Sequence, residues 1–269
     1  MPLQFDHYTR RTFFKRSSSF IPLLAALSPN LFLHQSGKSL INKDDTDLEK
    51  IARLLKQSAP VKWVFTGDSI TQGAKHTYGH QGYPEIFEER IRWEMRRSWD
   101  LVINSGINGT NTSSLLHDFD WCIGQFKPAV VSLMYGTNDC QAREIPGHVF
   151  EDNLNMLTDK IRGLGAVPIL QTPNPVNDDQ VATLGTRSRA KLGEYVEVIK
   201  DLAERKRVIL VDNWSYWKTN IGNEGENRYI DWLDDPLHPN ATGHLEIARL
   251  LFKQISIFDP NSFTCSGKK

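Results

Sequence analysis

The chain has 269 residues, and its 32 lysines and arginines are balanced by 32 aspartates and glutamates. That length suits one sizeable domain, and 39% apolar with 24% charged residues is ordinary for a globular protein. Because the formal net charge is zero, composition gives no reason to expect a nucleic acid or an anionic membrane surface as a partner.

Residues 1–33 have the pattern of an export signal. The paired arginines Arg10 and Arg11 precede a moderately apolar run from Phe20 to Leu33, which two prolines interrupt. That run is shorter than the roughly 20 apolar residues of a membrane-spanning helix, so we expect no stable membrane anchor. The arginine pair resembles the twin-arginine signal of bacteria, which implies the twin-arginine export machinery as a partner and a periplasmic or extracellular location. A disordered basic tail is the alternative, and residues 34–47 are expected to form a polar spacer.

Apolar runs and apolar stripes alternate along the rest of the chain. Short apolar runs predict five buried strands, at residues 61–65, 101–103, 129–135, 167–170 and 208–211. Apolar side chains at helical spacing predict helices, at residues 83–95, 115–126, 150–161, 192–202 and 245–255. The sequence therefore predicts one domain at residues 48–258, followed by a polar tail at 259–269.

The alternation of strands and helices with short connections favours a parallel sheet that has helices on both faces. The predicted fold class is α/β, a single-domain three-layer α/β/α arrangement around five strands. Binding sites in such folds lie at the carboxyl ends of the strands. Four polar segments follow predicted strands and are expected to meet at one edge: Gly67-Asp68-Ser69, Asn104 to Gly109, Gly136 to Asp139, and the loop with Asp235 and His238.

Ser69 alone is weak evidence for a nucleophile, because serines after strands more often cap helices. A nucleophilic serine needs a base that removes its proton, and histidine is the usual base. His238 stands out among eight histidines because Asp235, three residues before it, can accept from its ring. A surface pair near a helix cap is the alternative. Suitable oxyanion donors are the Ser69 N–H, a glycine N–H in the turn at 104–109, and the Asn138 amide.

These segments together resemble the sequence blocks of the SGNH (GDSL) hydrolases. Four blocks match in order and spacing: Gly67-Asp68-Ser69-Ile70-Thr71, Asn104 to Gly109, Gly136-Thr137-Asn138-Asp139, and Asp235-Pro236-Leu237-His238. The first block departs from the family in having isoleucine rather than leucine after the serine. The Gly-x-Ser-x-Gly motif of the α/β-hydrolases is absent from the chain.

The resemblance implies a flavodoxin-like order of the five parallel strands and a site that uses no cofactor. It implies Ser69 as the nucleophile, His238 as the base and Asp235 as the acid that orients the base. The Ser69 N–H, Gly109 and Asn138 would then form the oxyanion hole.

Asp68 and Asp139 are expected to support the site, with Asp68 bracing the nucleophile turn. Asp139 could be a metal ligand beside Asp231, Asp234 or His244, but no spacing typical of metal ligands supports this, and we expect no metal. His76 and His80 are expected in a solvated loop, with a role in lining the pocket as the alternative.

Aromatic residues crowd the loop before Asp235. They belong either to the core or to an exposed surface that stacks on sugar rings, and three tryptophans are candidates for substrate binding: Trp214, Trp217 and Trp232. The cysteines are too few and too scattered for a disulfide framework or a zinc site, so we interpret them as thiols with at most one bridge: Cys122, Cys140 and Cys265.

The resulting prediction is an exported serine esterase that hydrolyses short acyl esters, chiefly acetyl esters of carbohydrates, through a seryl ester. Two rivals share the same motifs: an SGNH O-acyltransferase that passes the acyl group to a sugar, and a lipid esterase such as a lysophospholipase. A carbohydrate-binding module with an inactive site is a third rival, which the intact set of site residues disfavours.

Overall fold

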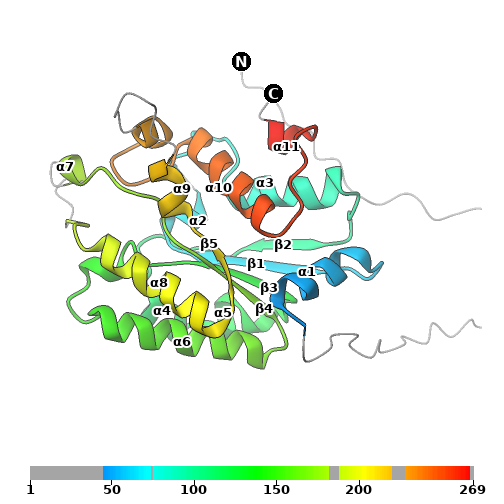
Figure 1. Cartoon of the computed structure of the whole chain (residues 1–269), viewed down its shortest axis with the longest axis horizontal. Helices are drawn as coiled ribbons and strands as arrows, with labels where there is room; N and C mark the ends of the chain where they lie inside the picture. Colours follow the sequence, from blue (N-terminus) through cyan, green and yellow to red (C-terminus); the bar gives the residue numbers. More distant parts are fainter. Residues whose placement is uncertain (1–44, 74, 182–187, 220–227, 267–269) are drawn as a thin grey trace, which may run out of the picture. The chain divides into compact units, whose positions relative to one another are not determined.

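Five parallel strands form the centre of the fold in the computed structural model, which describes residues 45–73, 75–181, 188–219 and 228–266, apart from the side chains of residues 178, 179, 228 and 229. The strands are β1 (Lys62–Gly67), β2 (Leu101–Asn104), β3 (Val130–Met134), β4 (Val167–Gln171) and β5 (Ile209–Val211). Their order across the sheet is β2-β1-β3-β4-β5, and all four pairings are parallel (Figure 1). This is the flavodoxin-like order, and it confirms the predicted sheet.

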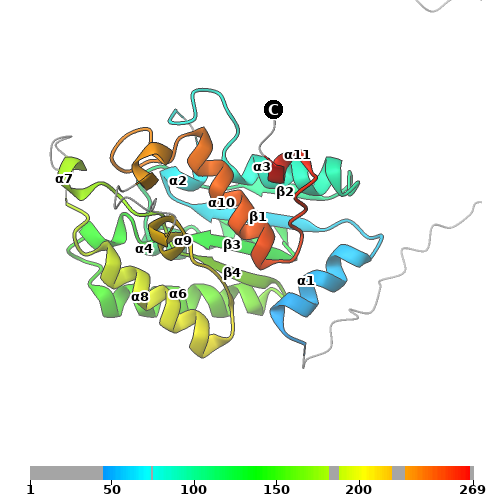
Figure 2. The ribbon, with the colours of Figure 1, turned by 45° about the horizontal axis from the view of Figure 1, so that its top comes forward.

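Helices cover both faces of the sheet, so the fold has three layers. One face is covered by α1 (Asp47–Lys56), α3 (Tyr83–Glu89), α9 (Asn213–Thr219) and α10 (Ala241–Gln254). The other is covered by α4 (Thr112–His117), α5 (Phe119–Cys122), α6 (Gly147–Gly163) and α8 (Leu192–Lys206), as Figures 1 and 2 show. Alternate strand residues point to opposite faces: Trp63 and Phe65 belong to the first core, and Val64 to the second.

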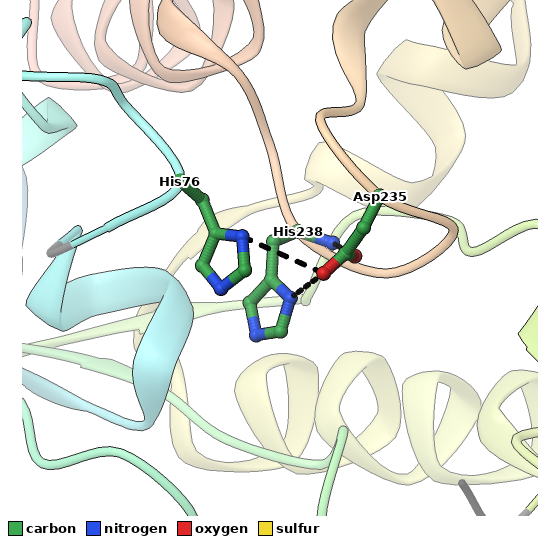
Figure 3. A group of neighbouring side chains, drawn as sticks. All are labelled: His76, Asp235 and His238. Atoms are coloured by element: carbon green, nitrogen blue, oxygen red, sulfur yellow. Dashed lines mark hydrogen bonds and ion pairs between the residues drawn. The ribbon is translucent and has the colours of Figure 1, made fainter. Parts of the chain in front are cut away.

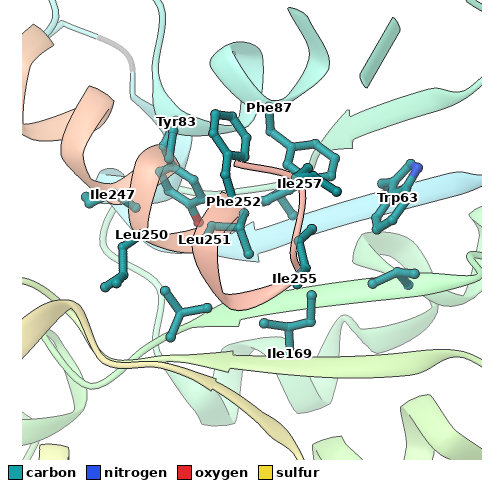
Figure 4. Packing of buried hydrophobic residues seen from close by; sticks show 14 of the residues in the cluster. Trp63, Tyr83, Phe87, Ile169, Ile247, Leu250, Leu251, Phe252, Ile255 and Ile257 are labelled. Carbon is teal, nitrogen blue, oxygen red and sulfur yellow. The ribbon is translucent and has the colours of Figure 1, made fainter. Parts of the chain in front are cut away.

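The first core fixes α10 against the sheet (Figure 4). Phe87 of α3 makes edge contact with Trp63 of β1, with ring centroids 5.1 Å apart, and also packs near Phe252 of α10. Trp63, Phe87 and Phe252 are all fully buried, and large aromatic side chains dominate core energetics. Asn240 caps α10 by accepting hydrogen bonds from the backbone of Thr242 and Gly243. The start of this helix is therefore held firmly, and His238 lies two residues before the cap.

The structure differs from the predicted helices in two places. The segment at 115–126 is three short pieces, because the backbone leaves the helical region at Asp118 and again at Ile123: these are α4, α5 and the 3-10 turn η2 (Gly124–Phe126). The helix at 83–95 continues from α3 into a π turn, η1 (Arg90–Glu94). The remaining short elements are α2 (Ser69–Gln72), η3 (Asp139–Gln141), α7 (Asp178–Val181), η5 (Arg228–Trp232) and α11 (Phe263–Ser266).

The two ends of the domain also differ from the prediction. Helix α1 begins at Asp47, capped by Thr46, so the end of the expected polar spacer is part of the domain. The expected polar tail contains α11, in which the Thr264 N–H donates to Glu94 at 2.8 Å and Cys265 is buried in the first core. The expected signal at residues 1–33 lies outside the described residues.

All three cysteines are buried thiols: Cys122, Cys140 and Cys265. Within the part of the chain that the structure describes, no helix combines the length and apolarity that a membrane crossing requires.

Candidate active site

Ser69 lies at the carboxyl end of β1, which pairs with β2 on one side and with β3 on the other. The strand ends at Gly67, Asp68 caps the following turn of helix, and Ser69 is the first residue of α2. A Cβ atom at position 67 would lie 2.1 Å from Thr71 Oγ1 and 2.7 Å from the carbonyl oxygen of Met134 on β3. The tight strand-to-helix turn therefore requires glycine before the serine, and it places Ser69 at the rim of the sheet.

Ser69, His238 and Asp235 form one continuous line of hydrogen bonds. Ser69 Oγ is 2.8 Å from His238 Nε2, across 169 residues of sequence, and His238 Nδ1 is 2.8 Å from Asp235 Oδ2. An ionised carboxylate can only accept, so Nδ1 carries the ring proton and Nε2 is free to accept from the serine hydroxyl. The three residues that the sequence predicted as a catalytic triad are therefore brought together in the geometry of nucleophile, base and orienting acid (Figure 3 shows His238 and Asp235).

The environment keeps Asp235 ionised and His238 neutral. Partial burial alone would raise the pKa of Asp235, but hydrogen bonds from His238 N–H, Leu237 N–H and the His238 ring together hold it below its ordinary value. Burial lowers the pKa of His238 below its ordinary value, against the opposing attraction of Asp235. A neutral imidazole beside a serine hydroxyl is the protonation state that a general base needs.

The loop that carries Asp235 and His238 is a tight, closed turn. Leu233 and Pro239 form an antiparallel bridge across it, and Asp234 N–H donates to the His238 carbonyl at 2.8 Å. Within the turn, one carboxylate oxygen of Asp235 accepts from the backbone while the other accepts from the His238 ring. The three-residue spacing between acid and base is thus converted into a fixed orientation.

Asn138, a predicted oxyanion donor, is held from both ends of its amide. Its Nδ2 donates to the Thr110 carbonyl at 3.0 Å, and its Oδ1 accepts from Gln141 at 3.3 Å and from Arg189 at 3.4 Å. The buried Arg189 also donates to the Thr137 carbonyl at 2.7 Å. An amide nitrogen carries two hydrogens, so one N–H of Asn138 remains for a ligand.

Gly109, the other predicted donor outside α2, precedes Thr110 in the turn after β2. Its φ of +76° lies in the left-handed region, and a Cβ added there would meet nothing within 4 Å. Backbone conformation therefore favours glycine at this position, whereas packing does not. Its role in an oxyanion hole stays a prediction.

Asp68 and Asp139 lie beneath the nucleophile and are almost completely buried. Asp68 accepts from Ile70 N–H at 2.9 Å, and burial raises its pKa to about 7, with the nearby charge of Asp139 acting in the same direction. Asp139 accepts from the backbone and hydroxyl of Thr112 and from Gly136 N–H, and burial raises its pKa as well. These carboxyls brace the turns after β1, β2 and β3.

His76 lies beside His238, so for this histidine the pocket-lining alternative holds rather than the expected solvated loop. Its ring stacks on the ring of His238, with centroids 3.8 Å apart, and its Nδ1 lies 2.9 Å from Asp234 Oδ2 (Figure 3 shows the two rings). Ligating atoms of His76, Asp235 and His238 lie within 4.8 Å of one another. Nothing local marks His76, because it lies 158 residues from its partner Asp234. The neighbouring His80 is exposed.

The other candidates lie in different environments. Trp217 is fully buried and meets the ring of Trp232 edge-on at 5.1 Å, so it belongs to the core, which is the alternative that the sequence left open. Trp232 and Trp214 are partly buried, and Lys218 lies over the ring of Trp214 at 4.0 Å. His244 is buried, accepts from Tyr83 N–H and has a pKa lowered to about 3 by burial, so it is a neutral core residue.

Comparison with protein families identifies the chain. The GDSL-like lipase/acylhydrolase family model matches residues 65–245, a span that contains Ser69, Gly109 and Asn138 and the loop with Asp235 and His238. The chain therefore belongs to this family of carboxylic ester hydrolases.

Similar proteins cover the same domain. The acetylxylan esterase of Geobacillus stearothermophilus is 26% identical over 222 residues, which cover 75% of this chain and 96% of that protein. Its crystal structure matches with a TM-score of 0.58 over 72% of this chain and 94% of the other, at 22% identity. LAE5, an alpha/beta hydrolase from the metagenome of Lake Arreo, matches with a TM-score of 0.62 over 74% of this chain and 96% of the other, at 22% identity. These two structural matches support the fold.

A Mycoplasma pneumoniae protein is 38% identical over 100 residues, but the match spans 37% of this chain and 11% of that protein.

Proposed function

We propose that this family member is an exported serine esterase that removes short acyl groups, above all acetyl, from a carbohydrate. The observation that carries the proposal is the unbroken line from Ser69 Oγ through the His238 ring to Asp235, with 2.8 Å at each step. The similarity to an acetylxylan esterase supports an acetylated polysaccharide or oligosaccharide as the substrate class.

The proposed reaction has two halves. Ser69 Oγ attacks the ester carbonyl carbon while its proton moves to His238 Nε2, and the oxyanion receives hydrogen bonds from Ser69 N–H, Gly109 N–H and Asn138 Nδ2–H. His238 then gives the proton to the departing sugar oxygen, which leaves the acyl group on Ser69. Water then attacks the carbonyl carbon of this seryl ester while His238 takes a proton from the water. His238 gives that proton to Ser69 Oγ as the carboxylic acid departs, which restores the serine hydroxyl.

The experiment that tests this function compares Ser69→Ala with the wild type on p-nitrophenyl acetate and on a panel of acetylated polysaccharides. We expect the variant to fold and to lose hydrolysis by at least about 10⁴-fold, because the nucleophile is gone. Full turnover by Ser69→Ala would refute the serine mechanism. Adding an acceptor sugar to the wild type separates hydrolysis from acyl transfer, and esters of increasing chain length separate an acetyl esterase from a lipid esterase.

Export is the second part of the proposal and rests on the paired arginines, Arg10 and Arg11, before the apolar run. A fluorophosphonate probe that reacts with Ser69 can be used to locate the enzyme in fractionated cells. We expect label outside the cytoplasm for the wild type and inside it when both arginines are replaced by lysine. Label in the cytoplasm for both forms would remove export from the proposal without affecting the esterase mechanism.

A further inference from the structure

His76 lies flat against the proposed catalytic base. The planes of the His76 and His238 rings differ by 5°, and their centroids are 3.8 Å apart. His76 Nδ1 is 2.9 Å from Asp234 Oδ2 and 3.5 Å from Asp235 Oδ2. Two aspartate–histidine pairs from adjacent carboxylates therefore lie side by side, and His238 is the member that reaches Ser69. Figure 3 shows the two rings together with Asp235.

The geometry of His76, Asp235 and His238 suits a hydrogen-bonded pair of stacked rings better than a cation-binding site. A histidine binds a metal through a lone pair that lies in the plane of its ring. Because the rings of His76 and His238 are parallel and stacked, their in-plane lone pairs lie in two parallel planes and cannot point toward one ion. Both Nδ1 atoms also lie within hydrogen-bond distance of carboxylates, which need them as donors.

We propose that His76 is a positioning residue which, held by Asp234, keeps the ring of His238 in the plane that joins Ser69 to Asp235. The inference rests on the proposed function, since it needs His238 to be the base. Hydrogen bonds at Nδ1 and Nε2 fix two points of the ring but leave rotation about the line between them. A second ring packed against its face restrains that rotation. A misplacement of about 1 Å in a catalytic group can cost about 10²-fold in rate.

The charges around the stack give His76 a second, measurable effect. The groups that face the two rings are Asp234 and Asp235 of the triad loop, His244 of α10, and Tyr78, whose hydroxyl interacts with Asp234. Beyond burial, a protonated His76 lowers the pKa of His238 by repulsion, whereas both carboxylates raise it. Removing the ring of His76 should therefore raise the pKa of His238 and shift the acid limb of kcat/KM to higher pH.

The test uses the full-length enzyme, p-nitrophenyl acetate and a pH series from about 5 to about 8. We expect His76→Ala to lower kcat by about 10-fold to 100-fold with KM changed less than about 2-fold, and to shift the acid midpoint upward. His76→Phe restores a flat ring without the charge, so kcat should recover to within about 3-fold of the wild type while the midpoint stays shifted. The matched control is His80→Ala, which removes an exposed histidine from the same loop and should leave both quantities unchanged.

A folded His76→Ala enzyme with the kcat and the midpoint of His80→Ala would overturn the inference. If His76→Ala fails to fold, Asp234→Asn decides the matter, because an unchanged kcat in that variant, which alters the group that holds the His76 ring, contradicts the positioning role. A double-mutant cycle adds a check: Asp234→Asn should lower kcat in the wild type but have little further effect in His76→Phe. Hydrolysis that survives Ser69→Ala defeats the proposed function itself, whereas hydrolysis that depends on Ser69 but ignores His76 defeats only this inference.

Discussion

Two pairs of aspartates flank Ser69, and they are built in opposite ways. Asp68 and Asp139, below the nucleophile, are at most 1% exposed, and their hydrogen bonds join neighbouring turns of backbone. The side chains of Asp234 and Asp235, beside the base, are 16% and 27% exposed, and each faces a histidine ring. The first pair holds turns of the backbone together, and the second pair holds the two histidine rings that the proposed mechanism uses. The two pairs are therefore distinguished by their hydrogen-bond donors. Their positions in the sequence motifs do not show this difference.

The largest expected effect tests the second pair. Asp235→Asn should lower kcat by about 10⁴-fold, because an amide nitrogen facing His238 Nδ1 cannot accept its proton and would favour the wrong tautomer. The free energy of unfolding should change by no more than about 1 kcal/mol, since the backbone hydrogen bonds to Oδ1 can be kept by the asparagine carbonyl. Steady-state kinetics and urea denaturation measure the two quantities.

The chain offers a matched control for that variant. His117 and Asp118 form an exposed pair at 2.8 Å, the same separation as in the triad but away from it in sequence and burial. Asp118→Asn should leave kcat unchanged. Equal losses of activity in the two variants would mean that the aspartate–histidine contact of the triad has no special role.

A smaller effect is expected when the first pair is altered. Asp139→Asn should destabilise the fold by about 2–3 kcal/mol, because three buried donors from Thr112 and Gly136 converge on a group that now offers one acceptor oxygen. The urea midpoint should fall with little change in its slope. A variant that is inactive yet as stable as the wild type would break the distinction between the two pairs and give Asp139 a part in the chemistry.

The sequence predicted the sheet more completely than the surroundings of His238. The five strands were predicted to within a few residues, because each is a buried apolar run with a turn at its end. Ser69, Asp235 and His238 were predicted because their motifs follow those strands. His76 was predicted only as a pocket-lining alternative to a solvated loop, because its contacts depend on how two loops 158 residues apart meet. Trp217 could not be assigned to the core or to the surface, because an aromatic-rich segment is compatible with either location.

The C-terminal end was missed for a related reason. Residues 259–269 are polar on average, so composition predicts a tail, yet Thr264 and Cys265 are buried through specific contacts with Glu94 and the first core. These contacts depend on where η1 lies in the fold. The sequence of residues 259–269 has no apolar periodicity that would reveal them.

Asp68 and the core residue His244 should make opposite contributions to the pH dependence of stability. Burial raises the pKa of Asp68 to about 7, so between about pH 4 and about 7 the folded chain holds a proton that the unfolded chain has released, and stability falls as pH rises. Burial lowers the pKa of His244 to about 3, so between about pH 3 and about 6.5 the unfolded chain holds the extra proton, and stability rises with pH. Each group contributes a slope of about 1.4 kcal/mol per pH unit, and the two oppose each other between about pH 4 and about 6.5.

The variant Asp68→Asn removes one of these two opposing contributions to stability. The asparagine carbonyl can still accept from Ile70 N–H, but the side chain cannot titrate. The contribution of Asp68, which lowers the free energy of unfolding as pH rises, therefore disappears, and the opposite contribution of His244 remains. The unfolding free energy of the variant should therefore climb more steeply than that of the wild type from about pH 4 to about 6.5, by about 1.4 kcal/mol per unit. Urea denaturation at several pH values measures both curves, with Asp118→Asn as the exposed control whose curve should parallel the wild type. Parallel curves for Asp68→Asn as well would show that Asp68 is ionised in the folded chain over this pH range.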